Sequence, residues 1–157
     1  MNLLLILQKK YQLSSPRYQR QQGTKEPKGQ KTTAKKVVVS YIYLDRAQGQ
    51  SLEQWDRSAG RLLRWENIVQ RLNTLTVAQA LAQQDIIKYN NLDADQFNMP
   101  KNSMWKYPAH LNHLKIVWCK IIVMQLVRVI GFMDDNVFYV VFLDEKHEFY
   151  PTEPKNT

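Results

Sequence analysis

The 157-residue chain has 44% hydrophobic and 23% charged residues, the composition of an ordinary globular protein, and its length suits one domain with a normal core. Its single cysteine, Cys119, excludes an intramolecular disulfide and favours a reducing compartment. The longest later apolar stretch, residues 121–132, is interrupted by Gln125 and Arg128 and falls short of the ~20 residues that a membrane helix needs. We therefore expect a cytoplasmic protein.

The net charge of +8 is concentrated at the N-terminal end. Residues 1–36 contain nine Lys or Arg and one acid, whereas residues 37–157 hold 13 basic and 13 acidic side chains. The first segment is rich in Gln, Lys, Ser, Thr, Gly and Pro, so it cannot bury enough apolar surface to offset the entropy of ordering. We predict a flexible basic tail over residues 1–36, a single domain over residues 37–151 and a disordered C-terminus over residues 152–157.

The end of the basic tail carries Lys35 and Lys36, which are candidate contacts to nucleic acid. A basic arm attracts phosphate backbones without sequence preference. The alternative is a solubilising extension without a binding role.

A strand and a long helix are predicted at the start of the domain. VVVSYIYL, residues 37–44, is β-branched and aromatic, which is typical of a strand. Ser51 with Gln54 has the pattern of a capping box, and apolar residues then recur every three or four positions as far as Leu72. This periodicity predicts one amphipathic helix of about six turns.

A second helix and three strands complete the predicted domain. A second capping box, Thr76 with Gln79, opens a helix that we expect to end at Asn90-Asn91, before a polar connection over residues 91–110. The rest is dense in strand formers: HLKIVWCKII, LVRVIGFM and NVFYVVFLD. The order strand, helix, helix, strand, strand, strand predicts an α+β fold, with one antiparallel sheet and both helices on one face. The expected core is Trp55, Leu62, Val69, Ile116, Trp118, Ile130, Phe138 and Val140.

The last two strands bring Arg128 and Asp144 together. We predict a hairpin loop over residues 134–136, because Asn136 tolerates the left-handed conformation that such loops need. Counting outward from this loop places Arg128 diagonally across from Asp144, on one face with several apolar residues: Ile130, Phe132, Phe138, Val140 and Phe142. Either Asp144 neutralises a structural arginine, or Arg128 holds a phosphate bidentately.

His147 and Tyr150 follow the last strand and are three residues apart. They point the same way if the segment turns helically. An imidazole and a phenol are suitable proton-transfer groups for in-line attack by a ribose hydroxyl. The alternative is that both are bystanders at the end of a strand.

An arginine stripe follows one side of the predicted long helix, formed by Arg57, Arg61, Arg64 and Arg71. It is either a surface for RNA or a protein partner, or a solvated face. The pair Glu53 and Arg57 has the stabilising i,i+4 orientation and favours the solvated face.

A metal or cofactor site is not indicated by the sequence. His110 and His113 with Cys119 match no common ligand spacing, and no Gly-rich phosphate loop is present. We expect neither a metal nor a cofactor.

The stretch LVRVIGFMDDNVFYVVFLDEKHEFYP, residues 126–151, resembles the small RelE/ParE-type toxins of bacterial toxin–antitoxin modules. The resemblance implies a strand, two helices and a three-stranded antiparallel ending. It also implies metal-independent messenger-RNA cleavage on the ribosome for the RelE branch, and gyrase inhibition for the ParE branch. Carried over, Arg128 would bind the scissile phosphate, His147 would transfer a proton, Tyr150 would orient or stack on the substrate, and Lys146 would add a phosphate contact.

The prediction from the sequence is therefore a RelE-like toxin, a metal-independent endoribonuclease acting on messenger RNA. Its expected partners are RNA or the ribosome and a cognate antitoxin or other protein, and no membrane. The alternative is a non-catalytic interaction protein of a mobile element, either gyrase-inhibitor-like or a partner-binding factor.

Overall fold

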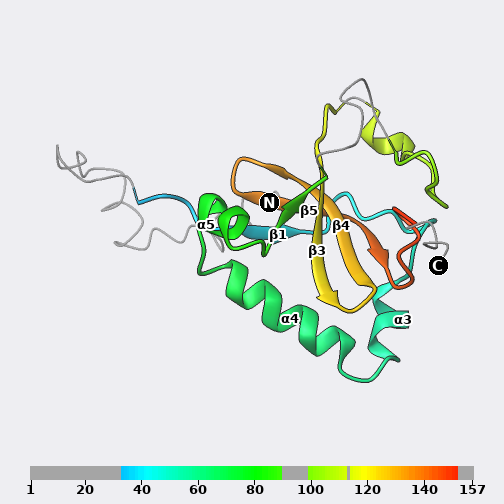
Figure 1. Cartoon of the computed structure of the whole chain (residues 1–157), viewed down its shortest axis with the longest axis horizontal. Helices are drawn as coiled ribbons and strands as arrows, with labels where there is room; N and C mark the ends of the chain where they lie inside the picture. Colours follow the sequence, from blue (N-terminus) through cyan, green and yellow to red (C-terminus); the bar gives the residue numbers. More distant parts are fainter. Residues whose placement is uncertain (1–32, 90–98, 113, 152–157) are drawn as a thin grey trace, which may run out of the picture. The chain divides into compact units, whose positions relative to one another are not determined.

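A five-stranded sheet with strand order β1-β5-β4-β3-β2 forms the centre of the described chain (Figure 1). The computed structural model describes residues 33–89, 99–112 and 114–151. Its strands are β1 (Val38–Ser40), β2 (Ile87–Lys88), β3 (Trp118–Met124), β4 (Val127–Asp134) and β5 (Val137–Asp144). Its helices are α3 (Leu52–Asp56), α4 (Arg61–Leu72) and α5 (Val77–Ala82), with a 3-10 turn η1 (Ala109–Leu111). The α+β class is confirmed.

The predicted termini fall largely outside the described residues. Of the tail predicted over residues 1–36, only residues 33–36 are described, and residues 152–157 are not described. Lys36 forms an isolated antiparallel bridge with Thr76, and the next residue donates its amide to the carbonyl of Leu75 at 2.9 Å. The chain therefore enters the sheet beside the start of α5.

The sheet is mixed, so the prediction of a wholly antiparallel sheet is wrong at one edge. β1 runs parallel to β5, with Val38 opposite Val137, whereas β2, β3, β4 and β5 pair antiparallel in turn. The antiparallel pairing of β3, β4 and β5 could be predicted, because consecutive strands joined by tight turns must be antiparallel. The β1 strand pairs with a strand about 100 residues away along the chain, and no local pattern encodes the direction of such a pairing.

Gly60 divides the predicted long helix into α3 and α4. The Ser51 cap is confirmed, since Ser51 Oγ accepts the amide of Gln54 at 3.1 Å and Gln54 Oε1 accepts the amide of Ser51 at 2.7 Å. The helix nevertheless ends at Asp56, and Gly60 at φ +73° begins α4. Apolar residues keep their spacing across this break. Trp55 and Trp65, one on each side of it, are both buried.

The second predicted helix is shorter than expected and is followed by a strand. Its start is confirmed, because the side chain of Thr76 accepts the amide of Gln79 at 3.2 Å. It ends at Ala82, and Gln84 then takes the left-handed conformation at φ +60°. Residues 87 and 88 pair with β3. The helix end predicted at residues 90 and 91 lies outside the described residues.

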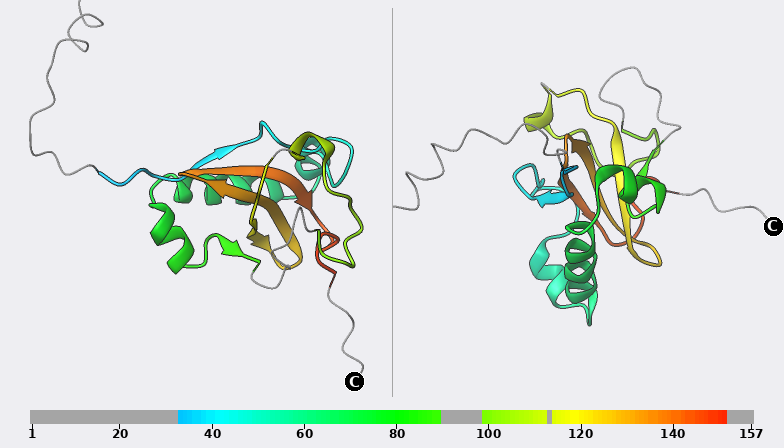
Figure 2. Two further views of the ribbon diagram at one scale, coloured as in Figure 1. Left: turned by 90° about the horizontal axis from the view of Figure 1, so that it is seen from above. Right: turned by 90° about the vertical axis from the view of Figure 1, so that its left-hand side faces the viewer.

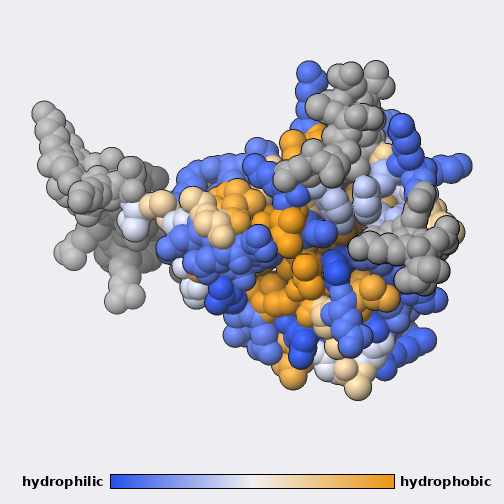
Figure 3. Space-filling view, in the orientation of Figure 1, coloured by the Kyte–Doolittle hydropathy of each residue, from blue (hydrophilic) through white to orange (hydrophobic). Residues whose placement is uncertain are grey.

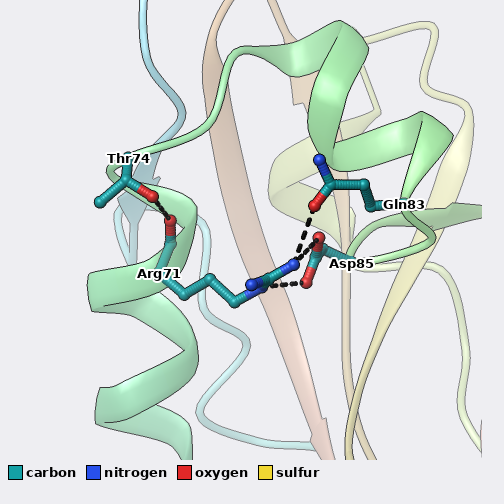
Figure 4. Close-up of polar contacts among 4 residues, drawn as sticks. All are labelled: Arg71, Thr74, Gln83 and Asp85. Atoms are coloured by element: carbon teal, nitrogen blue, oxygen red, sulfur yellow. Dashed lines mark hydrogen bonds and ion pairs between the residues drawn. The ribbon is translucent and has the colours of Figure 1, made fainter.

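Arg71 connects the last turn of α4 to the turn after α5 (Figure 4). Its Nε donates to Asp85 Oδ1 at 2.7 Å, and its Nη2 donates to Gln83 Oε1 at 2.9 Å and to Asp85 Oδ2 at 3.2 Å. The hydrogen bond and the charge of Asp85 raise the pKa of Arg71 above its ordinary value. A member of the predicted arginine stripe thus has a structural partner.

Two apolar clusters cover the two faces of the sheet. The helix-face cluster lies under the helices and is Val37, Trp55, Trp65, Leu72, Ala80, Ile86, Cys119, Ile121, Val123, Val127, Val129, Phe138, Val140 and Leu143. The aromatic-face cluster is Leu111, Trp118, Ile130, Phe132, Val141, Phe142 and Phe149. Residues between 99 and 116 pack on the aromatic-face cluster, and Figures 1 and 2 show η1 and α4 on opposite sides of the strands.

The eight predicted core residues all belong to these clusters or pack against them. The prediction placed them in one core on the helix face. They divide between the two faces, because residues of the predicted polar connection cover the second face. Trp105 and Tyr107 supply much of that cover, and the Trp105 ring lies 4.9 Å from the ring of Phe142.

The hairpin between β4 and β5 has a two-residue turn, Asp135-Asn136, with Asp135 at φ +49°. Asp134 is opposite Val137, one residue out of the predicted register, so Phe138 and Val140 lie on the helix face and not beside Ile130. A bulge at Val141 shifts the pairing again, since Gly131 is opposite Val140 and Ile130 is opposite Phe142. The two shifts together place Arg128 directly opposite Asp144.

The close approach of β4 and β5 at Gly131 predicts a strong effect of an added methyl group. A Cβ at residue 131 would lie 1.9 Å from the carbonyl oxygen of Tyr139, which is backbone that must shift. We expect Gly131→Ala to lower the free energy of unfolding by about 3 kcal/mol, measured by urea unfolding followed by tryptophan fluorescence. The matched control is Gly60→Ala, where a Cβ meets nothing within 4 Å and only the positive φ is strained. This control should cost about 1 kcal/mol. Equal losses would contradict the pairing of β4 with β5.

Candidate functional site

Arg128 lies on β4, on the same face of the sheet as Ile130 and Phe132. Directly opposite residues of antiparallel strands share a face, and Arg128 is opposite Ile122 on β3 and Asp144 on β5. Ile122 is 45% exposed, so the cover of the aromatic face stops before this row of residues. Figure 3 shows apolar surface among polar groups over β3. Arg128 therefore lies at the open end of the aromatic face.

Arg128 is not neutralised by Asp144. No ion pair joins these two side chains, both of which are in the described part of the chain. Arg128 Nη1 donates to the carbonyl oxygens of Gln125 and Val127, the latter at 3.1 Å, and its Nε is buried without a hydrogen-bond partner. The close ion pair of the first interpretation is therefore not formed, and Arg128 binds main-chain carbonyls at the turn between β3 and β4 instead. Its positive charge is left to act on its neighbours.

The carboxylate of Asp144 binds the main chain instead. The residue is 1% exposed, its Oδ1 accepts the amide of Glu148 at 2.8 Å, and its Oδ2 accepts the amide of Phe149 at 3.0 Å. Buried polar groups need such partners, and a carboxylate satisfied by two amides can remain charged. The turn over residues 145–149 is thus closed by the last residue of β5.

His147 lies in this turn, in the left-handed conformation at φ +63°, and its Nδ1 is buried without a hydrogen-bond partner. Burial lowers the pKa of His147 from its ordinary value of 6.5, and the charges of Arg128 and Lys120 lower it further. The charge of Asp144 and a hydrogen bond to the backbone of Tyr150 act in the opposite direction. The imidazole is therefore neutral at pH 7 and able to accept a proton.

Lys120 and Tyr89 join this group, and neither was predicted from the sequence. Lys120 is opposite Ile130, so it is on the aromatic face, and its Nζ lies 5.0 Å from the centroid of the Tyr89 ring. Burial and the charge of Arg128 lower the pKa of Lys120. Tyr89 follows β2, and burial, with the charge of Asp144, raises the pKa of its phenol.

The Arg128 cluster is the name that we give to these five side chains: Tyr89, Lys120, Arg128, His147 and Tyr150. The Tyr150 ring is 5.7 Å from the ring of Tyr89, and Tyr150 is 37% exposed. The structure thus brings together the three residues predicted as catalytic, and it adds a second cation and a second phenol. A signal for Lys120 existed, since it is the only charged residue between residues 116 and 123. Tyr89 gave none, because its segment was assigned to a helix.

The predicted nucleic-acid contacts lie in several places outside this cluster. Lys146 is exposed in the turn that carries His147, and Lys35 pairs with Asp135 near the hairpin turn. Lys36 is exposed, as are Arg57, which pairs with Glu53, and Arg64.

Arg61 is largely buried and does not present its charge to solvent. Its side chain is 13% exposed, its Nη2 lies 3.1 Å from Glu145 Oε1, and its guanidinium lies 5.9 Å from the centroid of the Trp55 ring. The exposed stripe proposed for RNA or a partner therefore does not include Arg61.

In the described ranges, no three His, Cys, Asp or Glu side chains lie so that they could share a metal ion. His113, one of the residues considered for a metal, lies outside those ranges. Burial raises the pKa of the Cys119 thiol to about 11, so this thiol is protonated at pH 7. Within the same ranges, no helix is long and apolar enough to cross a membrane.

Comparisons with protein-family models, with curated proteins and with solved structures give no match to this chain.

The electrostatic coupling within the Arg128 cluster predicts the behaviour of His147 in single variants. Because the charges of Arg128 and Lys120 lower the pKa of His147, Arg128→Met and Lys120→Met should each raise it toward its ordinary value of 6.5. The measurement is an NMR titration of the His147 imidazole. Arg64→Met, which removes an exposed arginine that does not affect His147, is the matched control and should leave the pKa unchanged. Identical titration curves in all four proteins would show that the cluster is not assembled.

Proposed function

We propose that this protein is a RelE-like toxin that cleaves messenger RNA at the Arg128 cluster without a metal ion. The observation that carries the proposal is geometric: the turn with His147 is closed by Asp144, which lies directly opposite Arg128 at the open end of one sheet face. The order of elements along the chain also supports a RelE-like domain. If α3 and α4 are counted as one helix divided at Gly60, two helices lie between β1 and the antiparallel strands β3, β4 and β5, and β2 is an addition.

The two cations provide a binding site for a phosphodiester. Arg128 Nη1 is bonded to main-chain carbonyls and Nε is buried, so Nη2 is the guanidinium nitrogen left to donate to a phosphate oxygen, and no ion pair with Asp144 competes for it. The ammonium of Lys120, held over the ring of Tyr89, adds a second positive charge. Charges placed in advance where negative charge develops are the largest contribution to many enzymatic rate enhancements.

His147 acts as the general base in this proposal. It takes the proton of the ribose 2′ hydroxyl, whose oxygen forms a bond to phosphorus while the bond from phosphorus to the 5′ oxygen breaks. The leaving 5′ oxygen takes a proton from solvent, and the imidazolium later returns its own proton to solvent. The products are a 2′,3′-cyclic phosphate and a 5′ hydroxyl. DNA has no 2′ hydroxyl and would not be cleaved.

Tyr150 holds the substrate base next to the reacting phosphate. Its ring is partly exposed and is braced from behind by Tyr89, as expected for a surface on which an unpaired base stacks. Lys146, exposed in the same turn, is an additional phosphate contact. The resemblance to the RelE branch adds the expectation that the RNA is bound on the ribosome and that a cognate antitoxin controls the activity.

Removal of either reacting group should abolish cleavage while the fold persists. We expect Arg128→Ala and His147→Ala to relieve growth arrest on expression and to lower the rate of RNA cleavage about 100-fold or more. Their melting temperatures should fall by only a few degrees, because neither side chain belongs to an apolar cluster and Arg128→Ala removes only two hydrogen bonds to carbonyls of the turn between β3 and β4. The control Arg46→Ala, which removes an exposed arginine outside the predicted RNA contacts, should keep wild-type activity. A wild-type protein that neither slows growth nor cleaves RNA in the presence of a chelator would falsify the proposal.

The pH dependence of cleavage follows from the lowered pKa of His147. The base must be neutral to accept a proton, and its neutral fraction rises as the pH rises through the pKa. Because this pKa lies below the ordinary value of 6.5, the rate should rise with pH on the acid side and be level from about pH 6.5 to about pH 8. Cleavage of a short RNA by the wild type and by Arg46→Ala should give the same profile. An acid limb whose midpoint differs from the pKa of His147 found in the NMR titration would exclude His147 as the base.

A second candidate function is binding to a protein partner at the outer edge of β1. Val38 is 48% exposed and Ile42 is 74% exposed, and β1 is the last strand at its end of the sheet. Exposed strand edges with apolar side chains pair readily with another chain. This non-catalytic alternative is the one that remains if the wild-type protein has no nuclease activity.

A further inference from the structure

Asp144 is the most deeply buried charged side chain among the described residues. It is 1% exposed, and the other buried acid of that part of the chain, Asp45, is 9% exposed. A buried carboxylate is costly unless charges or hydrogen bonds compensate it. Arg128, directly opposite on β4, does not form an ion pair with it, so the compensation comes from the main chain of residues 148 and 149.

The geometry of these hydrogen bonds determines where His147 lies. Each carboxylate oxygen takes one of two consecutive amides, that of Glu148 at 2.8 Å and that of Phe149 at 3.0 Å. The carboxylate thus closes a turn with His147 inside it, and closing it requires His147 to take a positive φ, which is unfavourable for a residue with a side chain. The two hydrogen bonds therefore oppose the return of His147 to a negative φ.

The two ends of the turn are held separately from its centre. At the start, the amide of Glu145 donates to Gln50 Oε1 at 2.6 Å, and the side chain of Glu145 pairs with Arg61. At the end, Phe149 is fully buried in the aromatic-face cluster, and the carbonyl of Glu148 accepts the amide of Met104 at 3.0 Å. These anchors fix the path into and out of the turn, whereas Asp144 fixes the conformation between them.

We propose that Asp144 is a positioning residue for His147: its two hydrogen bonds to the amides of Glu148 and Phe149 hold the turn in the conformation that places the imidazole beside Arg128 and Lys120. Its second effect is on Arg128, whose positive charge stays available because Asp144 is occupied by the main chain. The catalytic part of this inference rests on the proposed RNA cleavage at the Arg128 cluster. The positioning of the imidazole does not.

The test uses two variants of Asp144 in the full-length chain. Asp144→Asn removes the charge and one of the two acceptors, and Asp144→Glu keeps the charge but displaces it by one methylene. We expect both to lower kcat for RNA cleavage about 100-fold and to leave KM close to that of the wild type, because the phosphate-binding cations are retained. If the charge alone were needed, Asp144→Glu would keep wild-type kcat, and the positioning role would be wrong.

The matched control is Asp45→Asn. Asp45 is also buried and also accepts two main-chain amides, those of Ala47 at 2.8 Å and Gln48 at 3.2 Å, but it does not affect the pKa of His147. Asp45→Asn and Asp144→Asn should both lower the melting temperature, and only Asp144→Asn should lower kcat. Equal kcat values in these two variants would show that Asp144 stabilises the fold and does nothing more.

A measurement without RNA separates this inference from the proposed function. In an NMR titration, the groups that act on His147 are Arg128, Lys120, Asp144 and the backbone of Tyr150. Asp144→Asn should lower the pKa of His147 below that of the wild type, because the carboxylate that raises it is gone, and both Asp144 variants should move the imidazole resonances. If the wild type cleaves no RNA and the resonances still move in the Asp144 variants, the positioning role is supported and only the nuclease is refuted. Unmoved resonances in both variants overturn the positioning role, whether or not RNA is cleaved.

Discussion

The pairing of β4 with β5 is the constraint on which the rest of the structure depends. The two strands meet so closely at Gly131 that only a residue without a Cβ fits against the carbonyl of Tyr139. The two-residue turn and the bulge at Val141 then determine which face each later residue occupies. Phe138 and Val140 go to the helices, Phe142 goes to the aromatic face, and Arg128 comes to lie opposite Asp144. A shift of one residue would move each of these side chains to the other face.

Opposite charges that face each other across two strands do not form an ion pair in this protein. The Asp144 carboxylate is at the end of a strand, where main-chain amides without partners are close by, and it binds two of them. Two charge-assisted hydrogen bonds compensate its burial, while the Arg128 guanidinium is engaged by the main-chain carbonyls of Gln125 and Val127. The consequence is that Arg128 retains its charge and, with burial, lowers the pKa of both Lys120 and His147.

Local features of the fold were predictable from the sequence where a few neighbouring residues determine them. The capping boxes at Ser51 and Thr76 mark the helix starts because side chain and backbone bond within one turn. The break at Gly60 was missed because apolar spacing continued across it and the helical periodicity hid the interruption. The predicted hairpin was correct in position and wrong by one residue in register, since Asp134 remains paired. The candidate site was predictable to a similar extent. Arg128, His147 and Tyr150 could be predicted from residue type and order. Tyr89 could not, because its place depends on the pairing of residues 87 and 88 with β3.

The sequence by itself determined the α+β class, the starts of α3 and α5, the three C-terminal strands and the residues that have to be buried. These depend on contacts between residues close in the chain or on apolar side chains that any fold must remove from water. Only the tertiary structure decided that β1 runs parallel to β5, that residues within 99–112 and 114–116 cover the second face of the sheet, and that Asp144 binds the turn carrying His147 in place of Arg128. Each of these outcomes depends on the relative strength of interactions between groups that are distant in sequence or that compete for one partner. Such a comparison is settled by distances in space, which residue types and spacings do not contain.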